Sequence, residues 1–153
     1  MILELHQVTI DQRIRALSAT IESGQLVGIS GSQGSGKTTL LRALLGFIPV
    51  DSGHISIDGE LLTPLSAPWF RKQMAYVPQH LSVPEGYDMD TDYLRLLEKA
   101  VRSGKALILV DEPPQALSDA DCQTADRLLH EVAAKGALVL AVGPVITENW
   151  ITL

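Results

Sequence analysis

Residues 26–39 of the chain read LVGISGSQGSGKTT, and this stretch decides the fold. The short apolar run at 26–30 predicts a buried strand. The glycines that follow cannot extend that strand, and from Thr38 to Leu45 the leucines recur at helical spacing until Gly46. We therefore expect a strand, a glycine-rich loop and a helix in that order.

The loop has the residue types that bind phosphate. It matches the pattern G-x-x-x-x-G-K-[ST] at every fixed position, and it lies between a predicted strand and a predicted helix. Its glycines let backbone N–H groups point at phosphate oxygens, and the helix start adds the positive end of its dipole. Lys37 is expected to reach the β- and γ-phosphates, and Thr38 to hold Mg²⁺. The predicted nucleotide-binding residues are Gly31, Ser32, Gln33, Gly34, Ser35, Gly36, Lys37, Thr38 and Thr39.

A pair of carboxylates follows a second buried strand. Residues 106–110 read ALILV, which is apolar on both faces and suits a central parallel strand. Asp111 and Glu112 then emerge at the carboxyl end of that strand, where open α/β sheets bind their ligands. Asp111 suits a magnesium ion, and Glu112 suits the polarising of a water molecule.

The rest of the chain alternates strands and helices. Strands are expected at residues 2–10, 14–21, 53–58, 74–77, 137–142 and 150–153, and helices at 67–72, 91–103 and from a Ser118 cap to about 135. The apolar residues in 79–90 recur at no regular spacing, so this segment is expected to form a loop. The predicted fold is the three-layer α/β fold of P-loop NTPases, with a mainly parallel central sheet and a small N-terminal antiparallel sheet.

Composition excludes several classes of function. The chain has 153 residues, of which 46% are apolar, so residues 1–153 are expected to form a single domain. The net charge of -6 and the lack of a basic run give no reason to expect nucleic acid as a partner. No apolar stretch approaches the roughly 20 residues of a spanning helix, so direct membrane insertion is not expected. Arg13 and Arg15 are expected to lie on a solvated face.

Together these motifs resemble the nucleotide-binding domain of ATP-binding cassette (ABC) transporters. Residues 51–59, DSGHISIDG, and 70–79, FRKQMAYVPQ, also look like the family, the second especially like its exporters. Residues 107–113, LILVDEP, look like the Walker B strand with its catalytic glutamate. The resemblance implies ATP and Mg²⁺ as cofactors, with Glu112, Gln79 and Lys37 as catalytic residues and Thr38, Gln79 and Asp111 as the residues that hold the metal.

The chain also departs from the family. Only 31 residues separate Gln79 from Asp111, and the sequence contains no LSGGQ signature, so the family's helical subdomain is missing between 80 and 105. Gly143-Pro144 occupies the place of the switch histidine, and residues 115–118, QALS, keep the D-loop only in part. The aromatic residue that stacks on adenine would fall near Asp11 or Gln12, and neither side chain can stack.

Two readings follow from these matches and departures. The first is an ATP-binding cassette domain that binds Mg-ATP and, if active as an ATPase, drives a transporter. Its partners would be a transmembrane subunit and a second nucleotide-binding domain, in a homo- or heterodimer, and it would lie in the cytoplasm, held at the inner face of the cell membrane by a partner. The alternative is a nucleotide-binding regulatory or assembly module with little or no ATPase activity.

Two further interpretations have less support. A small-molecule kinase needs a lid rich in arginines, whereas residues 80–103 contain only Arg95 and Arg102. A truncated form of a longer cassette and a naturally reduced cassette would both lack the helical block.

Overall fold

A parallel sheet forms the centre of the protein. The computed structural model describes residues 1–78, 93–113, 117–143 and 145–153. Within these ranges, five strands pair in the order β6-β7-β8-β3-β9, and every pair is parallel. The strands are β3 (Leu26–Ser30), β6 (Met74–Val77), β7 (Leu107–Val110), β8 (Leu138–Val142) and β9 (Asn149–Thr152). The predicted parallel sheet is confirmed, and its central strand is β8.

A second, antiparallel sheet is built mainly from the N-terminal part of the chain. Its order is β2-β1-β4-β5, with β1 at Ile2–Ile10, β2 at Ile14–Glu22, β4 at Ser52–Ile57 and β5 at Glu60–Leu61. The N-terminal antiparallel sheet is thus confirmed. Its third strand, β4, pairs with β1 across about fifty residues of chain, and the two-residue β5 was not predicted.

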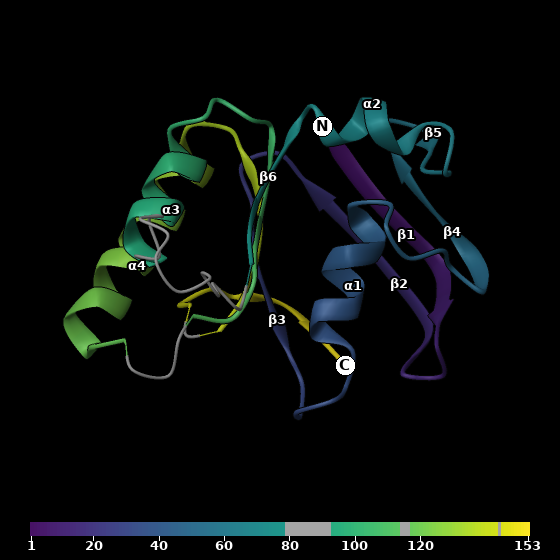
Figure 1. Ribbon diagram of the computed structural model, residues 1–153, viewed down its shortest axis with the longest axis horizontal. Coiled ribbons are helices and arrows are strands. Elements are labelled where there is room, and N and C mark those ends of the chain that lie inside the picture. Colours follow the sequence, from purple (N-terminus) through teal and green to yellow (C-terminus); the bar gives the residue numbers. More distant parts are fainter. Residues whose placement is uncertain (79–92, 114–116, 144) are drawn as a thin grey trace, which may run out of the picture.

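Helices cover both faces of the parallel sheet. Helix α1 (Lys37–Leu44) lies between the parallel and the antiparallel sheet, while α3 (Tyr93–Val101) and α4 (Asp119–Ala134) cover the opposite face (Figure 1). The short α2 (Ala67–Arg71) precedes β6. As predicted, Ser118 caps α4, because its Oγ accepts a hydrogen bond from the backbone N–H of Asp121 at 3.1 Å. No helix in the described residues is long and apolar enough to cross a membrane.

The side chains of β7 point alternately to the two faces of the parallel sheet, and each face has its own hydrophobic cluster. Leu107 and Leu109 belong to a cluster that includes α1 and the antiparallel sheet, whereas Ile108 and Val110 belong to a cluster with α3 and α4. All four side chains are at most 1% exposed. Successive side chains of a strand point to opposite faces, so a strand covered on both sides must be apolar throughout. This explains why residues 106–110 show no alternation of polarity.

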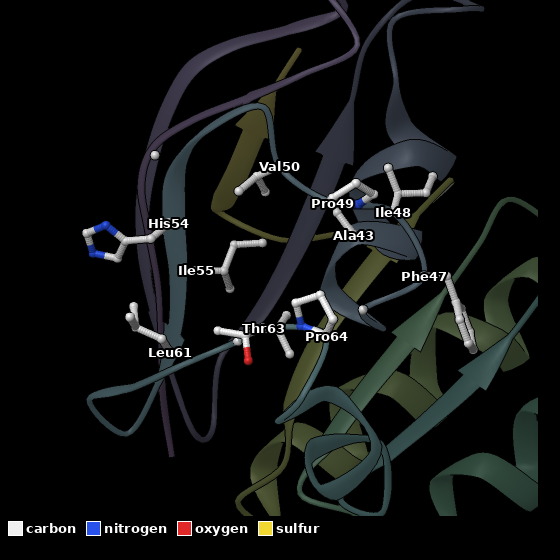
Figure 2. A pocket seen from close by; sticks show the side chains of 13 residues that line it. Ala43, Phe47, Ile48, Pro49, Val50, His54, Ile55, Leu61, Thr63 and Pro64 are labelled. Carbon is white, nitrogen blue, oxygen red and sulfur yellow. The ribbon is translucent and has the colours of Figure 1, made fainter.

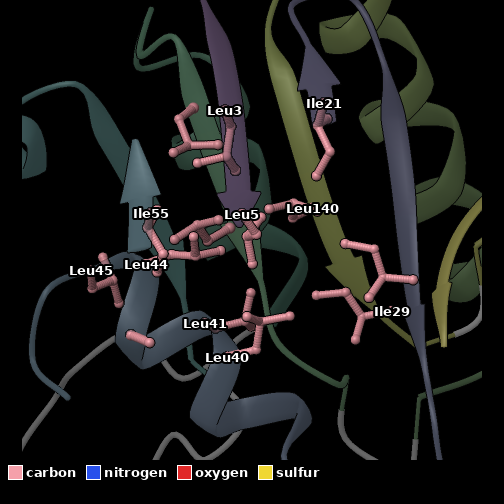
Figure 3. Packing of buried hydrophobic residues seen from close by; sticks show 14 of the residues in the cluster. Leu3, Leu5, Ile21, Ile29, Leu40, Leu41, Leu44, Leu45, Ile55 and Leu140 are labelled. Atoms are coloured by element: carbon pink, nitrogen blue, oxygen red, sulfur yellow. The ribbon is translucent and has the colours of Figure 1, made fainter. Parts of the chain in front are cut away.

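The first cluster fixes the helix that begins at the phosphate loop. Leu40, Leu41 and Leu44 of α1 point toward Leu5 and Ile55 of the antiparallel sheet and Ile29 and Leu140 of the parallel sheet (Figure 3). The start of α1, and with it the loop, is thereby held between the two sheets.

This packing makes a testable prediction. We expect Leu41→Ala to lower the free energy of unfolding by about 2–5 kcal/mol, because the fully buried side chain leaves a cavity between the sheets. The matched control is Leu65→Ala, at a leucine that is 95% exposed, which should change stability by less than about 0.5 kcal/mol. Urea unfolding followed by circular dichroism measures both. Equal losses would contradict the assigned position of α1.

Candidate functional site

The predicted phosphate loop and the predicted acidic pair meet at the carboxyl edge of the parallel sheet. Strands β3 and β7 both neighbour β8, so the loop after β3 and the carboxylates after β7 approach from its two sides. They enclose a pocket with a volume of about 480 Å³. Its lining residues are Arg13, Gln33, Gly34, Gly36, Lys37, Thr38, Thr39, Asp111, Glu112 and Val142.

The loop has a backbone suited to an anion. Gly34 and Gly36 have φ angles of +81° and +105°, a region that glycine adopts without strain. The Lys37 ammonium donates a hydrogen bond to the Gly31 carbonyl oxygen at 3.0 Å, which uses one of its three N–H donors and holds the charge across the loop. The Ser35 hydroxyl is buried and has no partner among the described residues, which fits a loop that closes around an anion.

Thr38 and Asp111 form the contact between the two halves of the site. The Thr38 Oγ1 donates to Asp111 Oδ2 at 3.0 Å and lies 3.3 Å from Oδ1. Asp111 is only 1% exposed, and its Oδ1 also accepts the backbone N–H of Glu112 at 2.8 Å. A hydroxyl and a carboxylate are hard oxygen ligands of the kind that Mg²⁺ uses, together with waters and phosphates. The pair fits a magnesium ion shared with a nucleotide.

Tyr76 joins this contact, and the sequence reasoning missed it. Its hydroxyl lies 3.5 Å from Asp111 Oδ2, which makes the hydrogen bond a long one. Burial, and then the negative charge of Asp111, raise the pKa of the Tyr76 phenol, so the group stays a neutral donor toward the carboxylate. The signal was present in the alternation of β6, where Met74 and Tyr76 share the face that packs toward α1.

The remaining predicted site residues fall into three groups. Glu112, Gln33 and Thr39 line the pocket, Ser32 is described but is not among the lining residues, and Gln79 lies outside the described residues. Of Gly143-Pro144, expected at the position of the switch histidine, Pro144 lies outside the described residues. A Cβ on Gly143 would lie 2.7 Å from Cδ of Pro113, so Gly143 has no room for a side chain. The catalytic and metal-binding roles of all these residues stay predictions.

Arg13 is the second residue that the sequence reasoning missed. It was expected on a solvated face, and its side chain is 53% exposed, but it also lines the phosphate pocket. It stands at the tip of the β1–β2 hairpin, which lies against the start of α1. No sequence pattern near Arg13 predicts this contact, because it arises where the β1–β2 hairpin packs against the phosphate loop.

A second hollow, of about 520 Å³, lies between α1 and the antiparallel sheet (Figure 2). It is mainly apolar, with Phe47, Ile48, Val50 and Leu61 among its lining residues. Among the described residues that line it, His54 is the only titratable one, so it offers no set of charged groups for phosphate or metal. The chemistry-bearing residues therefore gather at the pocket beside the loop.

The fold and this pocket define a P-loop nucleotide-binding domain. The family model for ABC transporters matches residues 14–141. The chain therefore belongs to the ABC transporter family, as one of its ATP-binding cassette domains. The solved structure of an ATP-binding subunit of an ABC transporter superimposes with a TM-score of 0.80 at 18% identity, over 100% of this chain and 86% of that one. This likeness supports the fold.

Curated relatives are named as ATP-binding proteins of transport systems. The zinc import ATP-binding protein ZnuC of Cereibacter sphaeroides is 31% identical over 86% of this chain and 66% of its own length. The manganese transport system ATP-binding protein MntB of Listeria innocua is 41% identical over 41% of this chain and 24% of its own length. The chain thus spans less than two thirds of these relatives. Their names do not favour the alternative of a regulatory or assembly module.

The contact between the loop and the hairpin can be tested at two glycines. A Cβ at Gly36 would lie 3.1 Å from Cγ1 of Ile14 and 3.3 Å from Cβ of Arg13, whereas a Cβ at Gly34 would meet nothing within 4 Å. Both alanine variants should lose about 1–2 kcal/mol of stability because both residues have positive φ. We expect Gly36→Ala to lose roughly 1–3 kcal/mol more, from overpacking against the hairpin. Equal losses in urea unfolding would show that the hairpin does not press on the loop.

Proposed function

We propose that this chain binds Mg-ATP in the pocket beside the phosphate loop, and that it powers a transport system when a partner domain completes the site for hydrolysis. The observation that carries the proposal is the hydrogen bond between Thr38 and the buried Asp111, with Lys37 lining the same pocket. It joins the phosphate loop to the metal-binding carboxylate, which lies 73 residues later in the sequence.

Each residue of the proposed site has a distinct task. Lys37 and the loop N–H groups bind the phosphate oxygens, and Thr38 with Asp111 would hold Mg²⁺. When bound, Mg²⁺ supplies positive charge that stabilises the transferring phosphoryl group. Glu112 follows Asp111 directly and lines the pocket, so it is placed to orient a water molecule toward the phosphate. Tyr76 donates to Asp111 and holds its carboxylate in place.

Hydrolysis is proposed to need a partner because this chain lacks two elements of the family. Its sequence has no LSGGQ motif. Gly143 has no side chain with which to contact a phosphate, and its place against Pro113 leaves no room for one. A second nucleotide-binding domain that carries the signature would supply the first of these contacts, and the contact absent at Gly143 would stay absent. By analogy with its relatives, the chain would work in the cytoplasm, beside a transmembrane subunit of the transport system.

Titration calorimetry with ATP, in Mg²⁺ and in EDTA, tests the binding half of the proposal. Lys37→Ala should weaken Mg-ATP binding by about two orders of magnitude or more. The substitution removes the ammonium group that would neutralise the negative charge of the bound phosphates. Asp111→Asn keeps the shape of the side chain, so it should retain ATP binding in EDTA but lose the gain in affinity that Mg²⁺ provides. Wild-type protein that binds no ATP would refute the proposal.

Phosphate release, measured for the chain alone, tests the catalytic half. We expect little or no release by the wild-type chain, together with intact binding. The variant Glu112→Gln should bind Mg-ATP as the wild type does. Release by the isolated chain that Glu112→Gln abolishes would instead establish a self-sufficient ATPase, and the requirement for a partner would be wrong.

A further inference from the structure

Two histidines stand opposite each other on the antiparallel sheet. His6 of β1 pairs with His54 of β4 in the strand register, and their ring centroids lie 4.9 Å apart with the planes inclined by 29°. Their distance along the sequence does not predict this contact. It arises because the chain returns to β1 with β4, after the phosphate loop and α1 have formed.

The pair lies on the face of the sheet that is turned away from the core. Leu5 and Ile55, the neighbours of His6 and His54 in the two strands, are 3% and 2% exposed and belong to the cluster around α1. Successive side chains of a strand point to opposite faces, and both histidines are accordingly exposed. Figure 2 shows His54 pointing to the opposite side of β4 from Ile55. Neither histidine lines the phosphate pocket.

The backbone beneath the pair is held in place. Gly53 has a φ angle of +76°, and a Cβ at this residue would overlap the carbonyl oxygens of His6 and Gln7. The two strands therefore approach so closely beside the histidines that only glycine fits. On the other side of β1, the backbone N–H of Gln7 donates to Ser18 Oγ of β2 at 2.9 Å. The positions from which the two imidazoles project are thus fixed before any ligand binds.

The ring nitrogens of both histidines are available to a ligand. Within the described part of the chain, neither imidazole has a hydrogen bond or an ion pair, whereas Nε2 of His130 lies 2.6 Å from the carbonyl oxygen of Ile146. A neutral imidazole has one nitrogen with a free lone pair, and this nitrogen suits Zn²⁺, Ni²⁺ and Cu²⁺. Glu4, two residues before His6 on the same face of β1, adds a negative charge that favours a cation.

The separation of the two rings suits two ligands of one ion. With a metal–nitrogen distance of about 2.1 Å and an angle at the metal of about 90–110°, the centroids of two bound imidazoles lie about 4.5–5.3 Å apart. The observed 4.9 Å falls within this range. Rotation about χ2, which is broad for histidine, would turn one nitrogen of each ring toward the ion. The described residues contain no group of three or more His, Cys, Asp or Glu side chains that could hold a metal, so water would complete the coordination.

We propose that His6 and His54 form a binding site for a divalent transition-metal ion such as Zn²⁺ or Ni²⁺, which joins β1 to β4. The site differs in chemistry from the phosphate pocket, because imidazole suits these ions whereas Mg²⁺ takes oxygen ligands. The two strands come together only in the folded chain, so the bound ion stabilises the antiparallel sheet. This inference does not rest on the proposed nucleotide binding.

Titration calorimetry with nickel chloride on the full chain, without nucleotide, tests the site. The wild type should bind one Ni²⁺. His6→Ala and His54→Ala should each weaken binding by at least about tenfold, the loss that even an outer partner of a metal ligand causes. An excess of Mg²⁺ should not displace Ni²⁺. His130→Ala is the matched control, because it removes an imidazole that already has a partner elsewhere, and it should bind Ni²⁺ as the wild type does.

Urea unfolding gives a second measurement on the same variants. Both substitutions are at exposed residues, so the variants should fold as the wild type does. Ni²⁺ at about ten times its dissociation constant should raise the unfolding midpoint of the wild type and of His130→Ala, and it should leave the midpoints of His6→Ala and His54→Ala unchanged.

Three results would overturn the inference. The first is a wild-type chain that binds no Ni²⁺. The second is wild-type affinity in either His6→Ala or His54→Ala, which would show that the two rings do not share an ion. The third is an equal loss in His130→Ala, which would show that Ni²⁺ binds histidines regardless of their place on the sheet. None of these results bears on the binding of Mg-ATP, so the proposed function stands or fails separately.

Discussion

The hydrogen bond between Thr38 and Asp111 depends on nearly every other feature of the fold. It requires the carboxyl ends of β3 and β7 to lie at one edge of the sheet with β8 between them, which the parallel pairing provides. It also requires α1 to begin at that edge, which its leucines secure by packing between two sheets. Asp111 is almost fully buried, and a buried carboxylate is costly unless hydrogen bonds or a cation offset its desolvation. The hydrogen bond from Thr38 offsets part of that cost, and it brings a hydroxyl and a carboxylate side by side at the pocket.

The departures from the family lie at the periphery of this arrangement. The loop, Lys37, Asp111 and Glu112 are retained, and in the proposed function they bind the nucleotide and orient water. The missing signature and the absent side chain at Gly143 concern contacts to the phosphate that come from beyond the loop. Binding and hydrolysis are therefore separable in this chain, because the first needs only residues that share one pocket.

Sequence reasoning predicted the elements well because their causes are local. The phosphate loop, the helix stop at Gly46 and the Ser118 cap each occupy a few adjacent residues. The strand and helix bounds in the structure agree with those expected within about two residues. What was missed is non-local. The pairing of β1 with β4, the short β5, the reach of Tyr76 to Asp111 and the place of Arg13 all arise from packing between distant segments. No period or motif along the chain encodes which hairpin tip will meet which loop.

The antiparallel sheet is consequently more than an appendage of the nucleotide site. Ile14 packs beside Gly36, Arg13 lines the pocket, and α1 is held on one side by β1 and β4. A ligand in the loop therefore contacts a structure whose other face is the antiparallel sheet. Both sheets therefore contribute residues to the phosphate pocket, and α1 packs between them.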